Sequence, residues 1–393
     1  MSSATAAKGV AGSSPQGVLD IIEVGNRREL DQFLKVPWPI YKNDPSWVPP
    51  LLVERKEFLN PRKHPFYKHG AATMFLAMLN GQPVGRVLAS DDPNYNLEHG
   101  TNAGCFGMFE SVDDPRVAQA LIARAGAWLR ARGRTQLLGP IDYSMNYSCG
   151  LLIDGFDTPA RVYSNHNPPY YSPLLDTCGL TKAKDLFAWW FEVQKNDLVP
   201  KLGRLADRLA RRGNVVVRPF NLKDLKGEVE RCKIVYNEAW ENNWGFVRMT
   251  DPEFEHFTKS LAQLVSPDQL LLAEVEGEVV GFSLLLPDFN EAMRPCDGRL
   301  FRWGLPIGLV RFLYNTRKIR NGRLLALGVK QQYRRRGISE LLILRTAERT
   351  KNQFCYDGCE LGWTLEDNTL INSAIESVGG KHYKTYRIYE KQI

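Results

Sequence analysis

The sequence has no apolar run long enough to cross a membrane and no apolar leader at its start. No stretch reaches the roughly 18 consecutive apolar residues that predict a transmembrane helix. Residues 1–17 are rich in Ser, Ala and Gly and lack the apolar segment of a signal peptide, so we predict a disordered tail there. From these absences we expect no transmembrane helix and no signal peptide, and a cytoplasmic location.

Cysteine is scarce, and its spacing fits neither a disulfide framework nor a metal site. The chain has seven cysteines, an odd number, and only Cys355 and Cys359 are close in sequence. No second pair and no histidine lies near these two, which argues against a zinc site. We therefore predict buried free thiols in a reducing compartment and no metal.

Neither sign of charge is in large excess. The formal net charge is +7, from 51 basic and 44 acidic residues. Such a balance favours an anionic partner, which can be a phosphate-rich cofactor, an anionic membrane surface or nucleic acid. No module for base stacking and base reading is recognisable, so nucleic acid is excluded as the partner. A length of 393 residues predicts about two domains.

The two halves of the chain share a repeated pattern. Residues 75–85 and 271–281 both read Leu-Ala, three residues, Gly, two residues, Val-Gly, and each predicts a β-hairpin. In each half a strand, a helix and another strand follow, in the second half at residues 324–329, 338–352 and 359–365. We predict two mixed α/β domains, and their bounds are 18–195 and 214–393, joined by a linker helix over 196–213.

A basic loop in the second half carries the clearest chemical signal. The strand ending at Val329 is followed by three arginines, a glycine and a helix. A helix N-terminus offers free backbone N–H groups and partial positive charge, and glycine allows a close approach of phosphate. The predicted anion-binding residues are Arg334, Arg335, Arg336, Gly337, Ile338 and Ser339.

This segment resembles motif A of the GCN5-related N-acetyltransferases (GNAT), read as Arg334-x-x-Gly337-x-Ser339 with Ser in place of Gly or Ala. The resemblance implies two tandem GNAT-like domains and acyl-CoA as co-substrate, with Val329 and Asn368 among the cofactor-binding residues. Ile375 stands where many members carry the Tyr that protonates the thiol. Substitutes for this general acid are water or one of three tyrosines, Tyr383, Tyr386 and Tyr389.

The first half lacks the basic loop. Residues 110–115 at the corresponding place are acidic and contain no glycine. Negative charge there would repel a pyrophosphate, so we predict a degenerate first domain that does not bind CoA and instead shapes the acceptor site.

Longer motifs from residue 21 to the end resemble the family that includes bacterial ceramide synthase. These motifs are residues 37–51, 139–140, 150–156, 167–171, 182–186, 236–246, 365–368 and 386–391. By that resemblance, the reaction is transfer of a fatty acyl group from acyl-CoA to the amine of a sphingoid base.

Three residues are candidates for proton transfer. Tyr236 and Glu238 precede the second hairpin, where this fold holds its acceptor, and Glu366 ends the strand beside the thioester. Asp367 is an alternative base, although a helix cap is its simpler role. Aromatic residues at four-residue spacing, such as Trp240 and Trp244, are also typical of an ordinary core.

Residues 299–320 combine aromatic and aliphatic side chains with six basic residues and no acidic one. Such a segment can lie on an anionic membrane surface, line an acyl channel, or form an ordinary buried helix. A peripheral site at the inner membrane face therefore accompanies the amino-lipid hypothesis. Two alternatives stay open: an acetyl-CoA-dependent N-acetyltransferase acting on a small amine or protein, and a non-catalytic acyl-CoA-binding protein.

Overall fold

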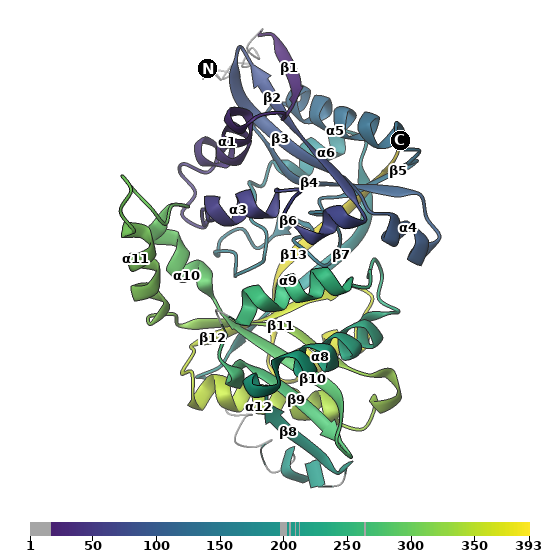
Figure 1. The fold of residues 1–393 in the computed structure, drawn as a ribbon, viewed down its shortest axis with the longest axis vertical. Helices are drawn as coiled ribbons and strands as arrows, with labels where there is room; N and C mark the ends of the chain where they lie inside the picture. Colours follow the sequence, from purple (N-terminus) through teal and green to yellow (C-terminus); the bar gives the residue numbers. More distant parts are fainter. Residues whose placement is uncertain (1–16, 197–202, 204–205, 209, 212, 263–264) are drawn as a thin grey trace, which may run out of the picture.

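The fold is given by a computed structural model that describes residues 17–196, 203, 206–208, 210–211, 213–262 and 265–393. The predicted tail, apart from residue 17, and most of the predicted linker helix lie outside the described residues. We call residues 19–192 the N-half and residues 215–392 the C-half. In Figure 1 the N-half lies above the C-half. Within the described residues, no helix is both long and apolar enough to cross a bilayer.

The N-half contains seven strands and six α-helices. The strands are β1 (Leu19–Glu23), β2 (Ala71–Leu79), β3 (Gln82–Asp91), β4 (Ala103–Ser111), β5 (Gln136–Gly139), β6 (Leu151–Asp154) and β7 (Thr181–Glu192). The helices are α1 (Arg27–Lys35), α2 (Pro37–Ile40), α3 (Leu52–Phe58), α4 (Pro93–His99), α5 (Pro115–Arg130) and α6 (Tyr171–Thr177).

The C-half repeats the order of the strands, except that its described residues hold no counterpart of β6. Its strands are β8 (Val215–Pro219), β9 (Leu270–Val275), β10 (Glu278–Pro287), β11 (Asn321–Val329), β12 (Gly358–Leu365) and β13 (Lys381–Gln392). Its helices are α8 (Leu225–Trp240), α9 (Asp251–Ala262), α10 (Phe289–Met293), α11 (Ile307–Thr316), α12 (Ile338–Asn352) and α13 (Thr369–Ser377).

The two repeated hairpins have the same geometry. Asn80-Gly81 in the first and Glu276-Gly277 in the second all have positive φ, as a two-residue type I′ turn requires. Ala77 pairs with Gly85, and Ala273 pairs with Gly281. The repeat seen in the sequence is therefore a repeat of backbone register.

One continuous sheet joins the two halves, in the order β1-β2-β3-β4-β5-β13-β7-β12-β11-β10-β9-β8. The last strand of each half lies beside the fifth strand of the other: β13 pairs with β5, and β7 pairs with β12. In Figure 1, β13 runs in yellow from the lower half into the upper half. Each half is thus completed by a strand from the other.

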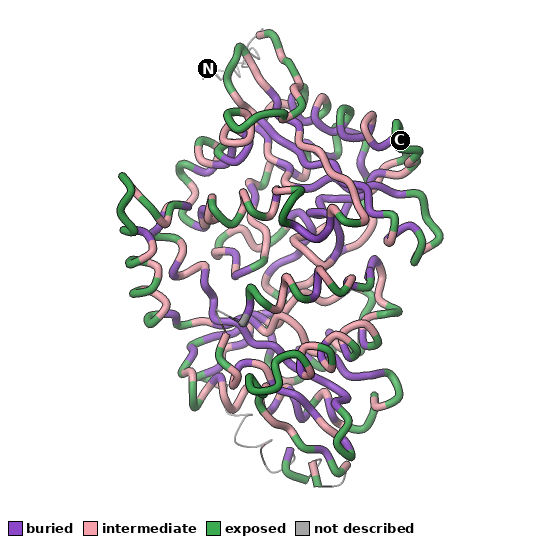
Figure 2. The backbone as a smooth tube through the Cα atoms, viewed as in Figure 1, coloured by how far each residue is buried: buried purple, intermediate pink, exposed green. Residues whose placement is uncertain are grey.

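The helices of the C-half cover both faces of its sheet. On β10, Phe282 contacts Trp240 of α8, whereas the next residue, Ser283, hydrogen-bonds Thr346 of α12 at 2.7 Å. Successive strand residues face opposite ways, so α8 and α12 lie on opposite faces. Figure 2 shows the buried strands between these exposed helical surfaces.

Candidate active site

The strands β11 and β12 separate partway along their length and leave a gap in the sheet. Their parallel pairing runs only from Asn321 with Gly358 to Leu324 with Leu361. At that point each strand carries a bulge toward its other neighbour, because Leu325 and Gly362 are each skipped in the pairing register. A bulge bends its strand, so the two bulges together explain why the strands diverge.

Two glycines allow close contacts along the gap. A Cβ on Gly362 would lie 3.0 Å from the carbonyl oxygen of Leu324. A Cβ on Gly328 would lie 2.5 Å from the ring of Trp240, which reaches across from α8. Between these positions, residues 325–327 of β11 are only half-buried, which leaves this part of the strand accessible.

The helix α12 begins at the wide end of the gap without a side-chain cap. Its N-cap is Gly337, with φ +77°, and no side chain there accepts a hydrogen bond from the first turn. The N–H groups of Ile338 and Ser339 are thus available to an anion, and the helix dipole favours negative charge there. The predicted loop residues therefore form a helix terminus suited to phosphate.

The three loop arginines differ in their surroundings. The Arg334 guanidinium donates to the carbonyl oxygen of Ala239 at 2.5 Å and to that of Val329 at 3.4 Å, so it fastens the loop to the end of α8. All three arginines are exposed, but no carbonyl contact of this kind is found for Arg335 and Arg336 among the described residues, and Arg336 lies over the Tyr333 ring at 5.0 Å. Arg335 and Arg336 are consequently the two with charge to offer a ligand.

Among the proton-transfer candidates, Tyr236 faces the N-half. Its hydroxyl donates to Oδ1 of Asn146 at 2.8 Å, and its ring contacts Trp240 and Phe246. Burial raises the pKa of Tyr236 above its usual value, so the phenol stays neutral near pH 7. The contact with Asn146 means that both halves contribute to this region.

The two glutamates lie elsewhere. Glu238 is 46% exposed, with Oε1 4.0 Å from Nζ of Lys330 at the wide end of the gap. Glu366 pairs with Lys182 at 2.5 Å and accepts from the backbone N–H of Asp185 at 3.1 Å. It lies four residues beyond the bulge at Gly362, so it stands at the same diverging end of the gap as Lys330, because Leu361 and Leu324 are paired and the two strands run parallel. Glu366 and Glu238 have different charged partners, Lys182 and Lys330.

Asn368 caps α13, accepting from the backbone N–H of Ile371 at 3.5 Å. Asp367 pairs with Lys184 at 2.8 Å, which lowers the pKa of Asp367. Ile375 is buried in α13.

The candidate substitute acids have different partners. The Tyr383 hydroxyl donates to Glu360, and Tyr389 shares a 2.7 Å hydrogen bond with Ser172. The Tyr386 hydroxyl is buried without a hydrogen-bond partner among the described residues.

A buried ion pair at the narrow end of the gap was not predicted from the sequence. Arg323 and Glu360 are direct cross-strand partners, 2.9 Å apart, and are 3% and 0% exposed. Ser164 of the N-half and Tyr383 also donate to this carboxylate. Charged residues at single strand positions carry no pairing information, so only the register reveals the pair.

The corresponding gap of the N-half is filled by the chain itself. The strands β4 and β5 pair only from Ala103 with Gln136 to Cys105 with Leu138. Beyond that point residues 140–149 return beside β4. Ile141 donates to the carbonyl of Phe106 at 2.7 Å, and Asp142 accepts from the N–H of Met108 at 2.8 Å. We call residues 140–149 the filling segment.

The helix that follows the filled gap, α5, is capped by a negatively charged side chain of the protein. The Asp114 side chain caps α5 by accepting from the N–H of Arg116 at 3.0 Å, and Pro115 supplies no N–H in the first turn. Asp114 is one of the acidic residues expected to repel phosphate, and its carboxylate occupies the N-terminus of α5 where a phosphate would otherwise bind.

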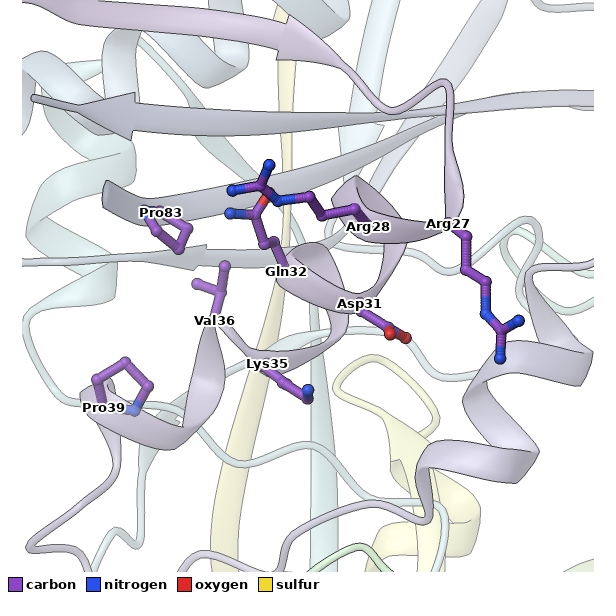
Figure 3. Close-up of a pocket in the computed structure, with 8 residues that line it drawn as sticks. All are labelled: Arg27, Arg28, Asp31, Gln32, Lys35, Val36, Pro39 and Pro83. Atoms are coloured by element: carbon purple, nitrogen blue, oxygen red, sulfur yellow. The ribbon is translucent and has the colours of Figure 1, made fainter. Parts of the chain in front are cut away.

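A small apolar cavity of about 50 Å³ lies under α12, beside the narrow end of the C-half gap. It is lined by Phe191, Val193, Leu324, Ile343, Leu344, Thr346, Ala347, Thr350, Cys359, Leu361 and Val378. A second, shallow hollow on the N-half (Figure 3) is lined by residues of α1 and by Val36, Pro39 and Pro83. It lies wholly within the N-half and forms no part of the C-half gap.

The fold is that of tandem GNAT proteins, as the motif resemblance predicted. A tandem GNAT protein from the clavulanic acid biosynthesis pathway aligns with a TM-score of 0.57 at 13% identity, covering 95% of this chain and 98% of that one. A GCN5-related N-acetyltransferase from Sphaerobacter thermophilus aligns with a TM-score of 0.51 at 12% identity, covering 95% of each chain.

Two sequence relatives are much more similar. Protein YghO of Escherichia coli (strain K12) is 35% identical over 375 residues, 94% of each chain. Bacterial ceramide synthase of Caulobacter vibrioides (strain NA1000 / CB15N) is 35% identical over 384 residues, 95% of this chain and 98% of its own. No family model matches the chain. The chain belongs to the family that contains these two proteins.

Proposed function

We propose that the protein is an acyl-CoA-dependent N-acyltransferase. The observation that carries this proposal is the open gap between β11 and β12, with the uncapped start of α12 at its wide end. Backbone groups along residues 325–329 suit the amides of a pantetheine arm, and the free N–H groups of α12 suit its phosphates. Arg335 and Arg336 would add charge to the same phosphates.

The chemistry that acyl-CoA supplies when bound is an activated thioester, which an amine attacks directly while CoA leaves as a thiol. The chain must position the amine, accept one of its protons and return a proton to the thiol. We propose Glu238 as the base and Tyr236 as a residue that orients the acceptor, with Glu366 as the alternative base. Because the Ile375 side chain has no ionisable proton, we propose that the acid is water or one of Tyr383, Tyr386 and Tyr389.

We propose a long-chain amine of the sphingoid type as the acceptor and a fatty acyl-CoA as the donor. Support comes from the family, since one relative at 35% identity is named a bacterial ceramide synthase. Such an acceptor is a membrane lipid, so the proposal includes a peripheral location at the cytoplasmic membrane face.

The acyl group is tested by coupled thiol release with acetyl-CoA and palmitoyl-CoA, each with and without sphinganine or its 3-keto form. Release that requires both palmitoyl-CoA and the sphingoid amine supports the proposal. Turnover with acetyl-CoA and a water-soluble amine alone would refute the lipid assignment.

One observation favours the acetyl-CoA alternative. The cavity beside the gap measures about 50 Å³, whereas a single water needs roughly 10–15 Å³ of such volume, so only a few methylenes fit. Ala347 lines this cavity, and Ala347→Leu should shift activity toward shorter acyl groups if the acyl chain enters it. Ile343→Ala should shift activity the other way.

A different observation favours binding without transfer. Ile375 is buried where a thiol-protonating Tyr is usual, and tight CoA binding without thiol release from any acceptor would support that reading. If transfer occurs, Glu238→Gln should lower turnover with little change in acyl-CoA affinity. Unchanged turnover across pH would remove Glu238 as the base.

A further inference from the structure

The segment before and within α11 exposes an unusual number of large apolar side chains. Seven of them lie within residues 301–314: Phe301, Trp303, Leu305, Ile307, Val310, Leu313 and Tyr314. We call these seven the α11 surface. Trp303 is 89% exposed, although indole is among the side chains that gain most from burial. Figure 1 shows α11 at the left edge of the molecule, and Figure 2 shows this segment largely exposed.

The backbone presents this surface by construction. Arg302 and Leu305 exchange backbone hydrogen bonds of 3.0 and 2.9 Å, which closes a two-residue turn. Trp303 and Gly304 occupy the turn with φ of +50° and +79°, so the indole stands at its tip. Along α11, Ile307, Val310 and Tyr314 follow at helical spacing and form one stripe.

The inner side of the same segment is firmly packed. Phe312 contacts Phe289 at 6.2 Å between ring centroids, and Gly308 is so close to Arg299 that a Cβ there would lie 1.9 Å from its carbonyl oxygen. Trp38 of the N-half donates to Asp297 just before the segment, at 2.9 Å. The outward apolar side chains are therefore additional to those that fold the segment.

The charge around this surface is positive. Six basic residues lie between 299 and 320 and no acidic residue does: Arg299, Arg302, Arg311, Arg317, Lys318 and Arg320. Two of them face carboxylates, Arg302 with Asp297 at 3.6 Å and Arg320 with Asp357 at 2.8 Å. Lys318 lies over the Tyr314 ring at 4.2 Å. Glu291 is another carboxylate at this end, accepting from the N–H of Arg320 at 2.8 Å.

We propose that the α11 surface docks on an anionic lipid bilayer. Trp303 and Phe301 enter the boundary between headgroups and acyl chains, α11 lies in the plane of the membrane, and the basic side chains contact lipid phosphates. The exposed apolar side chains match the acyl chains of such a bilayer, and the surplus positive charge matches its anionic headgroups. In a symmetric contact between two copies, the same cationic surface would face itself, which disfavours that occupant.

The proposed docking also sets the orientation of the protein relative to the membrane. The segment leads into the start of β11 at Asn321, whereas the arginine loop follows its other end at Val329. Nine strand residues span roughly 26 Å, so the predicted phosphate site stays on the side away from the lipid. This consequence rests on the proposed function, whereas bilayer binding itself does not.

Vesicle flotation of the full chain tests the proposal, with mixed phosphatidylglycerol–phosphatidylcholine vesicles against phosphatidylcholine alone. The protein should bind the anionic vesicles, and the double variant F301S/W303S should bind on the order of tenfold more weakly. The double variant L97S/L370S is the matched control, since these leucines are 86% and 83% exposed on other surfaces. Equal weakening by both double variants would overturn the proposal.

Two further arms separate charge from insertion. Arg299→Gln and Arg317→Gln should each weaken binding about fivefold at low salt. Brominated lipid should quench the fluorescence of the protein, and Trp303→Phe should remove most of that quenching while keeping the protein bound. Absence of binding to anionic vesicles would refute the proposal. A dimer in solution that is lost in F301S/W303S would instead assign the surface to a second copy.

Discussion

The gap between β4 and β5 and the gap between β11 and β12 begin in the same way and end differently. Both pairs of parallel strands separate after a few residues. In the N-half, residues 140–170, which include β6, connect β5 to α6, and the filling segment occupies the space. In the C-half, only residues 366–368 connect β12 to α13, and the gap stays open. The length of this connection thus accounts for one filled gap and one open gap.

The helices that follow the two gaps differ at their N-termini, where one is capped and the other is not. Asp114 caps α5 with a carboxylate, whereas Gly337 leaves the first turn of α12 uncapped. A protein carboxylate and a ligand phosphate compete for the same backbone N–H groups at a helix N-terminus. In the N-half the Asp114 carboxylate accepts from the first turn of α5, whereas the corresponding N–H groups of α12 in the C-half are open to a ligand. We therefore expect one acyl-CoA site per chain.

The largest expected effect comes from closing the open site. Gly337→Glu puts a side chain at φ +77° and a negative charge at the start of α12, so acyl-CoA affinity should fall on the order of 100-fold. Gly337→Asn, which tolerates this backbone conformation, is the matched control and should retain most of the affinity. Isothermal titration calorimetry measures both. Unchanged affinity in Gly337→Glu would show that the loop is not the phosphate site.

Disrupting the filling segment should cost stability without creating a second site. Asp142 is 7% exposed, and Asp142→Ala leaves the Met108 N–H unpaired, at a cost of about 2 kcal/mol in the free energy of unfolding. Asp142→Asn retains an acceptor and should lose less. Urea unfolding measures the cost, and titration should still give one CoA per chain. A second equivalent of bound CoA would mean that the filling segment alone excludes the ligand.

The filled gap should also be sensitive to acid. His64 is 3% exposed against Tyr143 and Tyr147 of the filling segment, and its ring lies 5.4 Å from that of His256 on α9. Burial lowers the pKa of His64 to about 3. The unfolded chain therefore binds the proton first, and stability should fall as pH drops from about 6.5 toward 3, by up to about 1.4 kcal/mol per pH unit.

His64→Phe keeps the ring contacts and removes the titration. Stability of this variant should depend less on pH within that window, as urea midpoints at neutral and mildly acidic pH would reveal. A slope identical to that of the unmodified chain would contradict the role of His64.

The smallest effects should come from substitutions at the N-termini of the two helices. Asp114→Ala should lower the free energy of unfolding by about 1 kcal/mol and leave acyl-CoA affinity unchanged. Ser339→Ala, in the first turn of the uncapped α12, should change stability by less than about 0.5 kcal/mol. A larger loss from Ser339→Ala would mean that the first turn of α12 relies on a side-chain cap, as α5 does.

Much of the C-half was predictable because its signals are local. The run from Val329 through Gly337 into an apolar-periodic helix specifies a strand, a turn and a helix within about two dozen residues, and α12 begins and ends at the predicted residues 338 and 352. The two hairpins were visible as a repeat because type I′ turns need glycine at fixed offsets.

The contacts of the candidate catalytic residues were not predictable. Tyr236 meets Asn146 and Glu366 meets Lys182, across separations of 90 and 184 residues. Such contacts depend on how strands from the two halves are ordered, and a single sequence holds no record of strand order.

The sequence by itself determined the repeated units, the GNAT class, and which half carries the basic loop, since each depends on residues close together in the chain. Only the tertiary structure decided that β7 and β13 exchange places, that residues 140–149 fill one gap, and that Trp303 faces outward. These outcomes follow from long-range pairing and from the length of a connection. The backbone N–H and C=O groups along a strand edge can pair with any other strand, so the packing of the whole molecule determines which strand lies beside it.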